Sequence, residues 1–172
     1  MVLDLRQFET FPVRKVLQGN LEALSIDFDS IDRIKDIEVI LDIQKSDNEY
    51  FCQAKITASV DLECSRCLKS FNSIVKDNTD FIVCSFDYVE DNKDIIDNEE
   101  YVCFKGTNLS VDLTNVIRQA IILAVSMKPL CTDDCQGLCP RCGINLNDKK
   151  CSCHEEHIDE RWEDLKKLSG KK

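Results

Sequence analysis

The sequence is poor both in residues that break regular structure and in residues that carry most enzyme chemistry. Its 172 residues include 5 glycines, 3 prolines and 2 histidines. It contains no Ser-His-Asp element and no glycine-rich phosphate loop. With 43% hydrophobic residues, the composition predicts an ordered globular chain. We expect it not to be an enzyme and to have no small-molecule substrate.

Features of membrane insertion and of export are also missing. No apolar run approaches the roughly 20 residues that span a bilayer, and the longest, 120–127, is far shorter. The first ten residues contain no basic stretch leading into an apolar run, which is the pattern of a secretory signal. We therefore expect no membrane partner and a cytoplasmic protein.

Positive charge is scarce. Lysine and arginine total 22 against 32 acidic residues, which gives a net charge of −10. Neutralisation of phosphates supplies most of the non-specific affinity for nucleic acid, so any RNA contact should be confined to a local patch. An acidic surface suits a basic protein partner at least as well.

Cysteine, by contrast, is abundant. Six of the 11 cysteines lie between residues 131 and 153. A Cys-Pro-Arg-Cys-Gly turn allows two thiolates to converge on one ion, and a Cys-Ser-Cys pair follows it closely. This spacing predicts a closed structural Zn²⁺ site with the ligands Cys139, Cys142, Cys151 and Cys153. A disulfide framework and a redox-active pair are the alternatives; the odd cysteine count and the missing secretory signal disfavour disulfides.

A second Cys-x-x-Cys pair, Cys64 and Cys67, lies far upstream. Two assignments stay open, because spacing does not decide between them. In one, a second zinc ion is bound by Cys64, Cys67, Cys131 and Cys135. In the other, only the C-terminal site is filled and the remaining thiols are free. The single cysteines Cys52, Cys84 and Cys103 have apolar neighbours, and we expect all three to pack in the core.

Apolar residues alternate with polar ones over 21–28, 37–43 and 50–64, which predicts strands with one face in water. The run Ser46-Asp47-Asn48-Glu49 predicts a hairpin turn. Residues 71–86 favour two short strands around Lys76-Asp77-Asn78.

The clearest helix is predicted over 112–127, with Asp112 as its N-cap and Pro129 beyond its end. Residues 87–100 carry seven acids and one lysine, which predicts a solvated loop. A short terminal helix is expected over 159–168.

These elements predict an α+β fold: an antiparallel, partly barrel-like sheet with one main helix and a C-terminal cysteine-rich zinc knuckle. We expect a β-rich domain over 1–130, and a cysteine-rich metal-binding segment with the short helix over 131–172.

Two cysteine elements together resemble those of a known family. Cys64-Ser-Arg-Cys67-Leu68, and the run from Cys135 through Cys139-Pro-Arg-Cys142 to Asn147, are similar to elements of the YceD-like family, the large ribosomal RNA subunit accumulation proteins. The tail 158–168 resembles the family's closing helix, with Glu160 in place of the usual proline. The resemblance implies a role in accumulation or maturation of the large-subunit ribosomal RNA.

The leading hypothesis is therefore a non-enzymatic ribosome-biogenesis factor, a zinc-stapled module that binds the large-subunit rRNA, a basic ribosomal protein or an assembly factor. The alternative is a redox-responsive thiol and zinc protein or chaperone. The candidate partner-binding residues are basic or aromatic side chains near the two Cys-x-x-Cys pairs and in the tail: Arg66, Arg141, Arg161, Trp162, Lys166 and Lys167.

Overall fold

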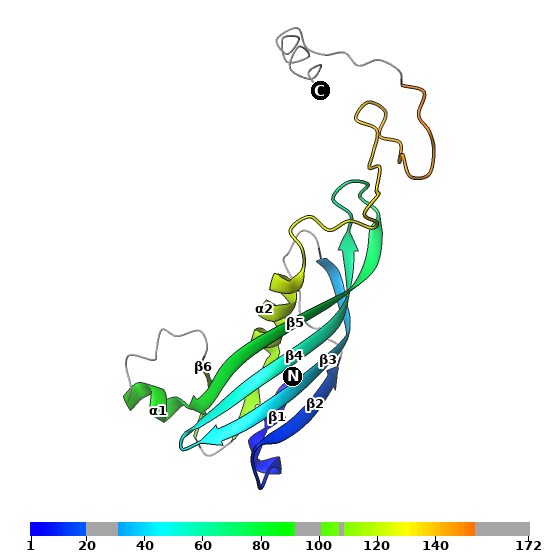
Figure 1. Ribbon diagram of the computed structural model, residues 1–172. Helices are drawn as coiled ribbons and strands as arrows, with labels where there is room; N and C mark the ends of the chain where they lie inside the picture. Colours follow the sequence, from blue (N-terminus) through cyan, green and yellow to red (C-terminus); the bar gives the residue numbers. More distant parts are fainter. Residues whose placement is uncertain (20–30, 92–100, 107–108, 154–172) are drawn as a thin grey trace, which may run out of the picture.

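The computed structural model describes residues 1–19, 31–91, 101–106 and 109–153, which form an elongated molecule around one long sheet (Figure 1). The strands lie in the order β2-β3-β4-β5-β6. Their bounds are β2 (Val13–Gly19), β3 (Ile31–Ser46), β4 (Glu49–Glu63), β5 (Ser70–Ser85) and β6 (Tyr101–Phe104). Strands β2 to β5 pair antiparallel, as predicted, and β6 adds a parallel edge beside β5.

The sheet does not close into a barrel, so the prediction of a partly barrel-like sheet is wrong. Among the described residues its end strands, β2 and β6, do not pair with each other. The apolar face is covered instead by helix α2 (Thr114–Ala124) and by a small sheet of β1 (Val2–Asp4) and β7 (Ser110–Asp112). Because these elements remove the face from water, it need not curl onto itself. The mixture of one large sheet with few helices fits the α+β class.

Alternation along the strands produces the core. In β4 every second residue from Tyr50 to Leu62 is buried, and its neighbours face outward. Helix α2 packs along β4 and β5 (Figure 1). The core is one cluster of aliphatic side chains, which includes Leu41, Ile43, Ile56, Val60 and Val83 from the sheet and Ile117, Ala120 and Ile121 from α2. The outer face of the sheet stays wet, as the alternation predicted.

The turn between β3 and β4 and the continuity of β5 test two local predictions. The hairpin is confirmed: β3 ends at Ser46 and β4 begins at Glu49, with Asp47 in the left-handed region (φ 46°). The break predicted at Lys76-Asp77-Asn78 is wrong, because β5 runs through it unbroken. There β5 pairs with β4 residue by residue, and this pairing satisfies the backbone groups that a turn would otherwise use.

The helices also differ from expectation. Helix α2 begins at Thr114 and ends at Ala124, so it is shorter than the predicted 112–127. Asp112 accepts a hydrogen bond from the Thr114 N–H, although Leu113 is the N-cap residue. Phe86–Asp91 forms a second helix, α1, where a loop was predicted, and Leu5–Gln7 forms one 3-10 turn. The predicted strand over 21–28, the rest of the acidic loop (92–100) and the terminal helix lie outside the described residues.

The length of β4 and β5 matters for the site. Their connection, residues 64–69, lies at one end of the sheet, and the chain leaving α2 returns to the same end (Figure 1). The Ser65 N–H donates to the Pro129 carbonyl over 2.9 Å, which fixes this approach. Within the described part of the chain, neither α-helix is long and apolar enough to cross a membrane.

Candidate metal centres

Four cysteines converge where the β4–β5 connection meets the chain that follows α2. This first cluster consists of Cys64, Cys67, Cys131 and Cys135, and its Sγ atoms all lie within 4.8 Å of one another. Two of the Sγ–Sγ distances are 3.8 Å (Cys64 to Cys135) and 3.7 Å (Cys67 to Cys131). A tetrahedral zinc ion with bonds of about 2.3 Å to sulfur needs sulfur separations of about 3.8 Å. The cluster therefore has the dimensions of a tetrathiolate site.

The first cluster is shielded from water. Cys64, Cys67 and Cys135 are buried, and Cys131 is half-buried. The partly buried side chains packed against them are Phe71, Leu130 and Leu138. Because the cluster takes two ligands from the sheet connection and two from the segment after residue 130, an ion bound there would tie the two predicted segments together.

A second cluster lies farther along the chain, beyond the end of the sheet. It consists of Cys139, Cys142, Cys151 and Cys153, whose Sγ atoms again lie within 4.8 Å of one another. Cys139 is buried and Cys151 half-buried, whereas Cys142 and Cys153 are exposed. All 11 cysteines are free thiols, so neither cluster is a disulfide framework. The two groups match the ligand sets that the sequence left open.

The two Cys-x-x-Cys turns have the same backbone conformation. In the first, the Cys64 N–H donates to the carbonyl five residues later (3.0 Å), and the Leu68 N–H donates back to the Cys64 carbonyl (2.9 Å). In the second, the Cys139 N–H and the Gly143 N–H make the equivalent bonds over 2.8 and 2.9 Å. Leu68 and Gly143 hold equivalent positions and both have positive φ, 56° and 72°. The chain thus contains two copies of one Cys-x-x-Cys turn.

These turns aim backbone N–H groups at sulfur. Burial by itself raises the pKa of Cys64, but N–H groups of Cys131, Cys67 and Arg66 outweigh it and lower the pKa to about 6. The backbone N–H groups of Cys142 and Arg141 lower the pKa of Cys139 to about 6 as well. Since the thiolate is the form that binds metal, each turn favours the ligating state of its first cysteine. The pKa of Cys67 behaves differently: the Lys69 N–H lowers it, but burial and the neighbouring thiols raise it to about 12.

A short hairpin connects the clusters. The bond from the Cys139 N–H to the Ile144 carbonyl belongs to this hairpin. Leu138 and Asn145 form an antiparallel bridge, and the Leu146 N–H donates to the Gly137 carbonyl over 2.9 Å. Gly137 has φ +75°, and a Cβ there would lie 3.1 Å from the Arg66 carbonyl oxygen. Glycine is required at this point both for the backbone angle and for the close approach.

The structure places only two of the predicted partner-binding residues. The Arg66 guanidinium donates to the Cys135 carbonyl over 2.9 Å, so this side chain holds the first cluster together. Arg141 is exposed on the turn of the second cluster. The other four lie outside the described residues: Arg161, Trp162, Lys166 and Lys167.

The three single cysteines lie away from both clusters. Cys52 and Cys84 are buried, as predicted, but Cys103 is exposed, so its assignment to the core is wrong. Its neighbour Phe104 faces the core, and alternation along β6 turns Cys103 to the opposite face. Burial raises the pKa of Cys52 to about 12, which keeps this thiol protonated and unreactive.

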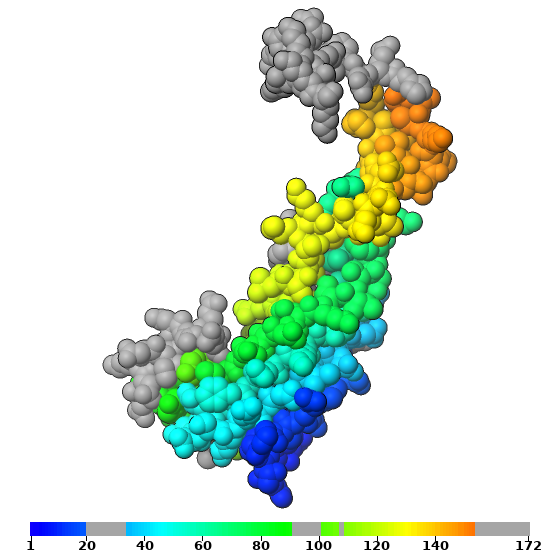
Figure 2. All heavy atoms as spheres, viewed as in Figure 1, coloured from blue at the N-terminus to red at the C-terminus, as the bar shows by residue number. Residues whose placement is uncertain are grey.

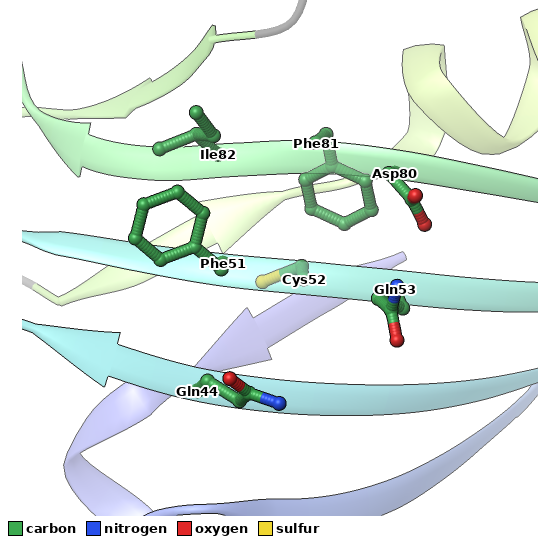
Figure 3. A pocket seen from close by; sticks show the side chains of 7 residues that line it. All are labelled: Gln44, Phe51, Cys52, Gln53, Asp80, Phe81 and Ile82. Carbon is green, nitrogen blue, oxygen red and sulfur yellow. The ribbon is translucent and has the colours of Figure 1, made fainter.

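The wet face of the sheet carries a shallow groove of about 390 Å³ (Figure 3). The Phe51 ring, 42% exposed, lies beside Ile82, and three polar side chains flank them: Gln44, Gln53 and Asp80. Its remaining lining residues are Cys52 and Phe81. These groups offer an aromatic surface and hydrogen bonds. The only thiol is the protonated Cys52, so the groove has contact surface rather than a nucleophile.

Sequence reasoning missed the side chain that joins the two clusters. Asn147 donates from Nδ2 to the Cys135 Sγ over 3.3 Å, although it lies between Cys142 and Cys151 in the sequence. In the sequence, Asn147 enters only as the last residue of the run that resembles the family element. An asparagine between two cysteines of one predicted ligand set has amide N–H groups that can donate to a nearby sulfur. This position is the signal that could have indicated a hydrogen bond to a metal ligand.

Comparison with known proteins identifies relatives. The family model described as "Large ribosomal RNA subunit accumulation protein YceD" matches residues 52–169, well over half of the chain. A chloroplastic YCED homolog 1 of Arabidopsis thaliana is 33% identical over 73 residues, 42% of this chain and 23% of that protein. An uncharacterized protein of Mycobacterium bovis is 32% identical over 108 residues, 63% of this chain and 50% of that protein.

The chain thus spans half or less of the length of these relatives. No solved structure matches it. The matched range contains both Cys-x-x-Cys turns and all eight clustered cysteines. The chain belongs to the family of large ribosomal RNA subunit accumulation proteins described as YceD.

Proposed function

We propose that the chain is a non-enzymatic factor in accumulation of the large-subunit ribosomal RNA, in which each cysteine cluster holds one structural Zn²⁺ ion. The observation that carries the proposal is the family match over residues 52–169 together with two tetrathiolate clusters inside it. Four thiolates complete the tetrahedral shell of zinc and leave no position for water or substrate. The ions would therefore fix a binding surface rather than perform chemistry.

The first ion would attach the segment after α2 to the tip of the sheet, and the second would close the loop beyond it. Cys64 and Cys67 would supply the sheet's half of the first site, and Cys131 and Cys135 the other half. The partner is the large-subunit rRNA or a basic ribosomal protein or assembly factor, since a net charge of −10 disfavours extended RNA contact. The cytoplasm is the expected compartment.

Elemental analysis of protein purified under reducing conditions tests the metal assignment. We expect two zinc ions per chain, with one lost in Cys139→Ser and one in Cys64→Ser. A single ion that is lost only in Cys139→Ser would show that the first cluster binds no zinc. Wild-type protein without zinc would overturn the assignment of both clusters.

Cells depleted of the protein test the biological role. We expect the large-subunit rRNA to fall relative to the small-subunit rRNA, and the wild-type chain to restore it. Unchanged rRNA levels on depletion would refute the role. RNase treatment of the isolated complex separates the partners: a basic protein partner stays bound, whereas a partner held through RNA is released.

A redox-responsive role is the second candidate, favoured by the exposure of Cys142 and Cys153. Peroxide could oxidise this thiolate pair to a disulfide, with peroxide reduced to water and zinc released. The test is to add peroxide at a near-stoichiometric amount and to monitor the released zinc with a chromophoric chelator. Retention of both ions would exclude this role.

A further inference from the structure

One side chain joins the two cysteine clusters, and it is not itself a metal ligand. Asn147 belongs to the loop between Cys142 and Cys151, which the second cluster closes. Its Nδ2 lies 3.3 Å from the Cys135 Sγ in the first cluster. A residue positioned by one site therefore contacts a ligand of the other.

The orientation of the Asn147 amide follows from its partners. The Gln136 backbone N–H lies 2.8 Å from one end of the amide, and an N–H can only donate, so that end must be Oδ1. The NH₂ end then faces the Cys135 sulfur and also donates to the Asn145 Oδ1 over 2.8 Å. With one N–H for each acceptor, both ends of the amide are satisfied.

The loop that carries Asn147 is held by its own contacts and by the second cluster. The Asn147 N–H donates to the Asn145 Oδ1 over 3.0 Å, and the Asp148 N–H donates to the Asn145 carbonyl over 3.2 Å. These bonds fix the turn locally. The loop is also joined to the segment beside Cys135, because the Gln136 N–H donates to the Asn147 Oδ1 and the Leu146 N–H donates to the Gly137 carbonyl. The ends of the loop are Cys142 and Cys151, which an ion in the second cluster would hold together. Without that ion nothing would hold Cys142 and Cys151 together through the metal, and the loop would position the Asn147 amide less firmly against Cys135.

We propose that Asn147 couples the two sites, so that Zn²⁺ in the second cluster strengthens Zn²⁺ binding in the first through the N–H···S contact to Cys135. The inference rests on the proposed zinc occupancy. An N–H donor stabilises a thiolate ligand because it offsets part of the charge that four sulfurs place around one ion. By linkage, an ion in the first cluster strengthens the second by the same factor.

The expected change in metal affinity follows from hydrogen bonds to metal ligands in other proteins. Loss of a hydrogen bond to a metal ligand usually costs 10-fold to 100-fold in metal affinity. Because Asn147 is exposed and water competes for its amide, we expect about tenfold, at the lower end of that range.

A double-mutant cycle on the full chain tests the coupling. Cadmium replaces zinc, and cadmium NMR with increasing chelator follows each cluster by its own resonance. The four proteins are the wild type, Asn147→Ala, the second-cluster variant Cys142→Ser/Cys153→Ser, and the combination. We expect the first cluster to lose cadmium about tenfold more readily in Asn147→Ala and in the second-cluster variant, with no further loss in the combination.

Two more variants separate the N–H···S contact from general loop support. Asn147→Asp keeps an acceptor for the Gln136 N–H but removes the donor, so it should weaken the first cluster at least as much as Asn147→Ala. Gln136→Ala is the matched control, because its side chain bonds only the Asp134 carbonyl and should leave both affinities unchanged. In the cobalt-substituted protein, Asn147→Ala should also shift the sulfur-to-metal charge-transfer band.

The outcomes separate the coupling through Asn147 from the assignment of the two metal sites. Two ions bound independently, with losses that multiply in the combined variant, would overturn the coupling and leave the zinc assignment intact. Wild-type affinity in Asn147→Asp would show that the residue only supports the loop. A wild-type chain that binds fewer than two ions would overturn the proposed metal sites and the coupling with them.

Discussion

Removal of zinc should unfold the segment 130–153 and leave the sheet folded. Apart from the cysteines, few contacts fix this segment to the sheet. Within the described residues, three hydrogen bonds join the β4–β5 connection to the chain from Pro129 onward: Ser65 N–H to the Pro129 carbonyl, Leu138 N–H to the Arg66 carbonyl, and the Arg66 guanidinium to the Cys135 carbonyl. The apolar contribution comes from half-buried side chains such as Leu130 and Leu138.

The magnitudes decide the outcome. Each hydrogen bond contributes about 1 kcal/mol net, so the three supply about 3 kcal/mol. Ordering the backbone of one residue costs roughly 1–2 kcal/mol, so these bonds offset the ordering of only two or three residues. A structural zinc ion contributes on the order of 10 kcal/mol. The segment therefore depends on its ions, whereas β4 and β5 are held by a ladder of fifteen paired positions and a buried core.

Hydrogen exchange with mass spectrometry, with and without a strong zinc chelator, measures the effect. The amides of Cys139 and Leu146 donate hydrogen bonds inside the segment, and the amide of Leu138 donates to the Arg66 carbonyl; all three should lose protection when zinc is removed. Peptides covering β4 should stay protected and serve as the internal control. Protection of the segment at vanishing free zinc would refute the reasoning, and so would simultaneous loss of protection in β4.

Three other changes give independent tests. Gly137→Ala should destabilise the first cluster by about 1–3 kcal/mol, because it combines a positive φ with a Cβ 3.1 Å from a carbonyl oxygen. Gly143→Ala has the positive φ alone and should cost less. Competition with a chelator compares the metal affinities of the two variants, and equal losses would contradict the steric argument. Ile121→Ala, at a fully buried contact between α2 and the sheet, should lower the free energy of unfolding in urea by about 2–5 kcal/mol without removing zinc; a change within error would show that the helix contributes little to the core. Burial raises the pKa of Cys52 from 9.0 to about 12, so the folded state binds this proton more tightly and the free energy of unfolding should fall as pH rises from about 9 to 12. Iodoacetamide at pH 9 should label Cys52 only after unfolding, and labelling of the native protein would contradict its burial.

The sequence predicted those features that depend on neighbouring residues. The hairpin at Asp47, the alternation of β4 and the Cys-x-x-Cys turn at Cys139 each follow from a few consecutive side chains. It failed where distant pairing decides. Asp77 sits opposite Ile56 of β4, and this pairing, invisible in a local window, converts a turn-like sequence into continuous strand. Cys103 was misplaced for a similar reason, since its face depends on how β6 lies beside β5.

The grouping of the cysteines shows the same limit. Cys64 and Cys131 are separated by 67 positions, so their spacing carries no information about a shared ion. They meet because β4 and β5 extend past α2 and because the chain leaving α2 runs to their connection (Figure 1 and Figure 2). The length of two strands and the direction of one helix thus determine the first ligand set, whereas the second needs only its own loop. This difference predicts an order of dependence: loss of the second cluster should weaken the first by the modest factor carried by Asn147. Loss of the first ion should release the chain after Leu130, and the second cluster with it, from the sheet, because the second cluster has no described cysteine in the sheet.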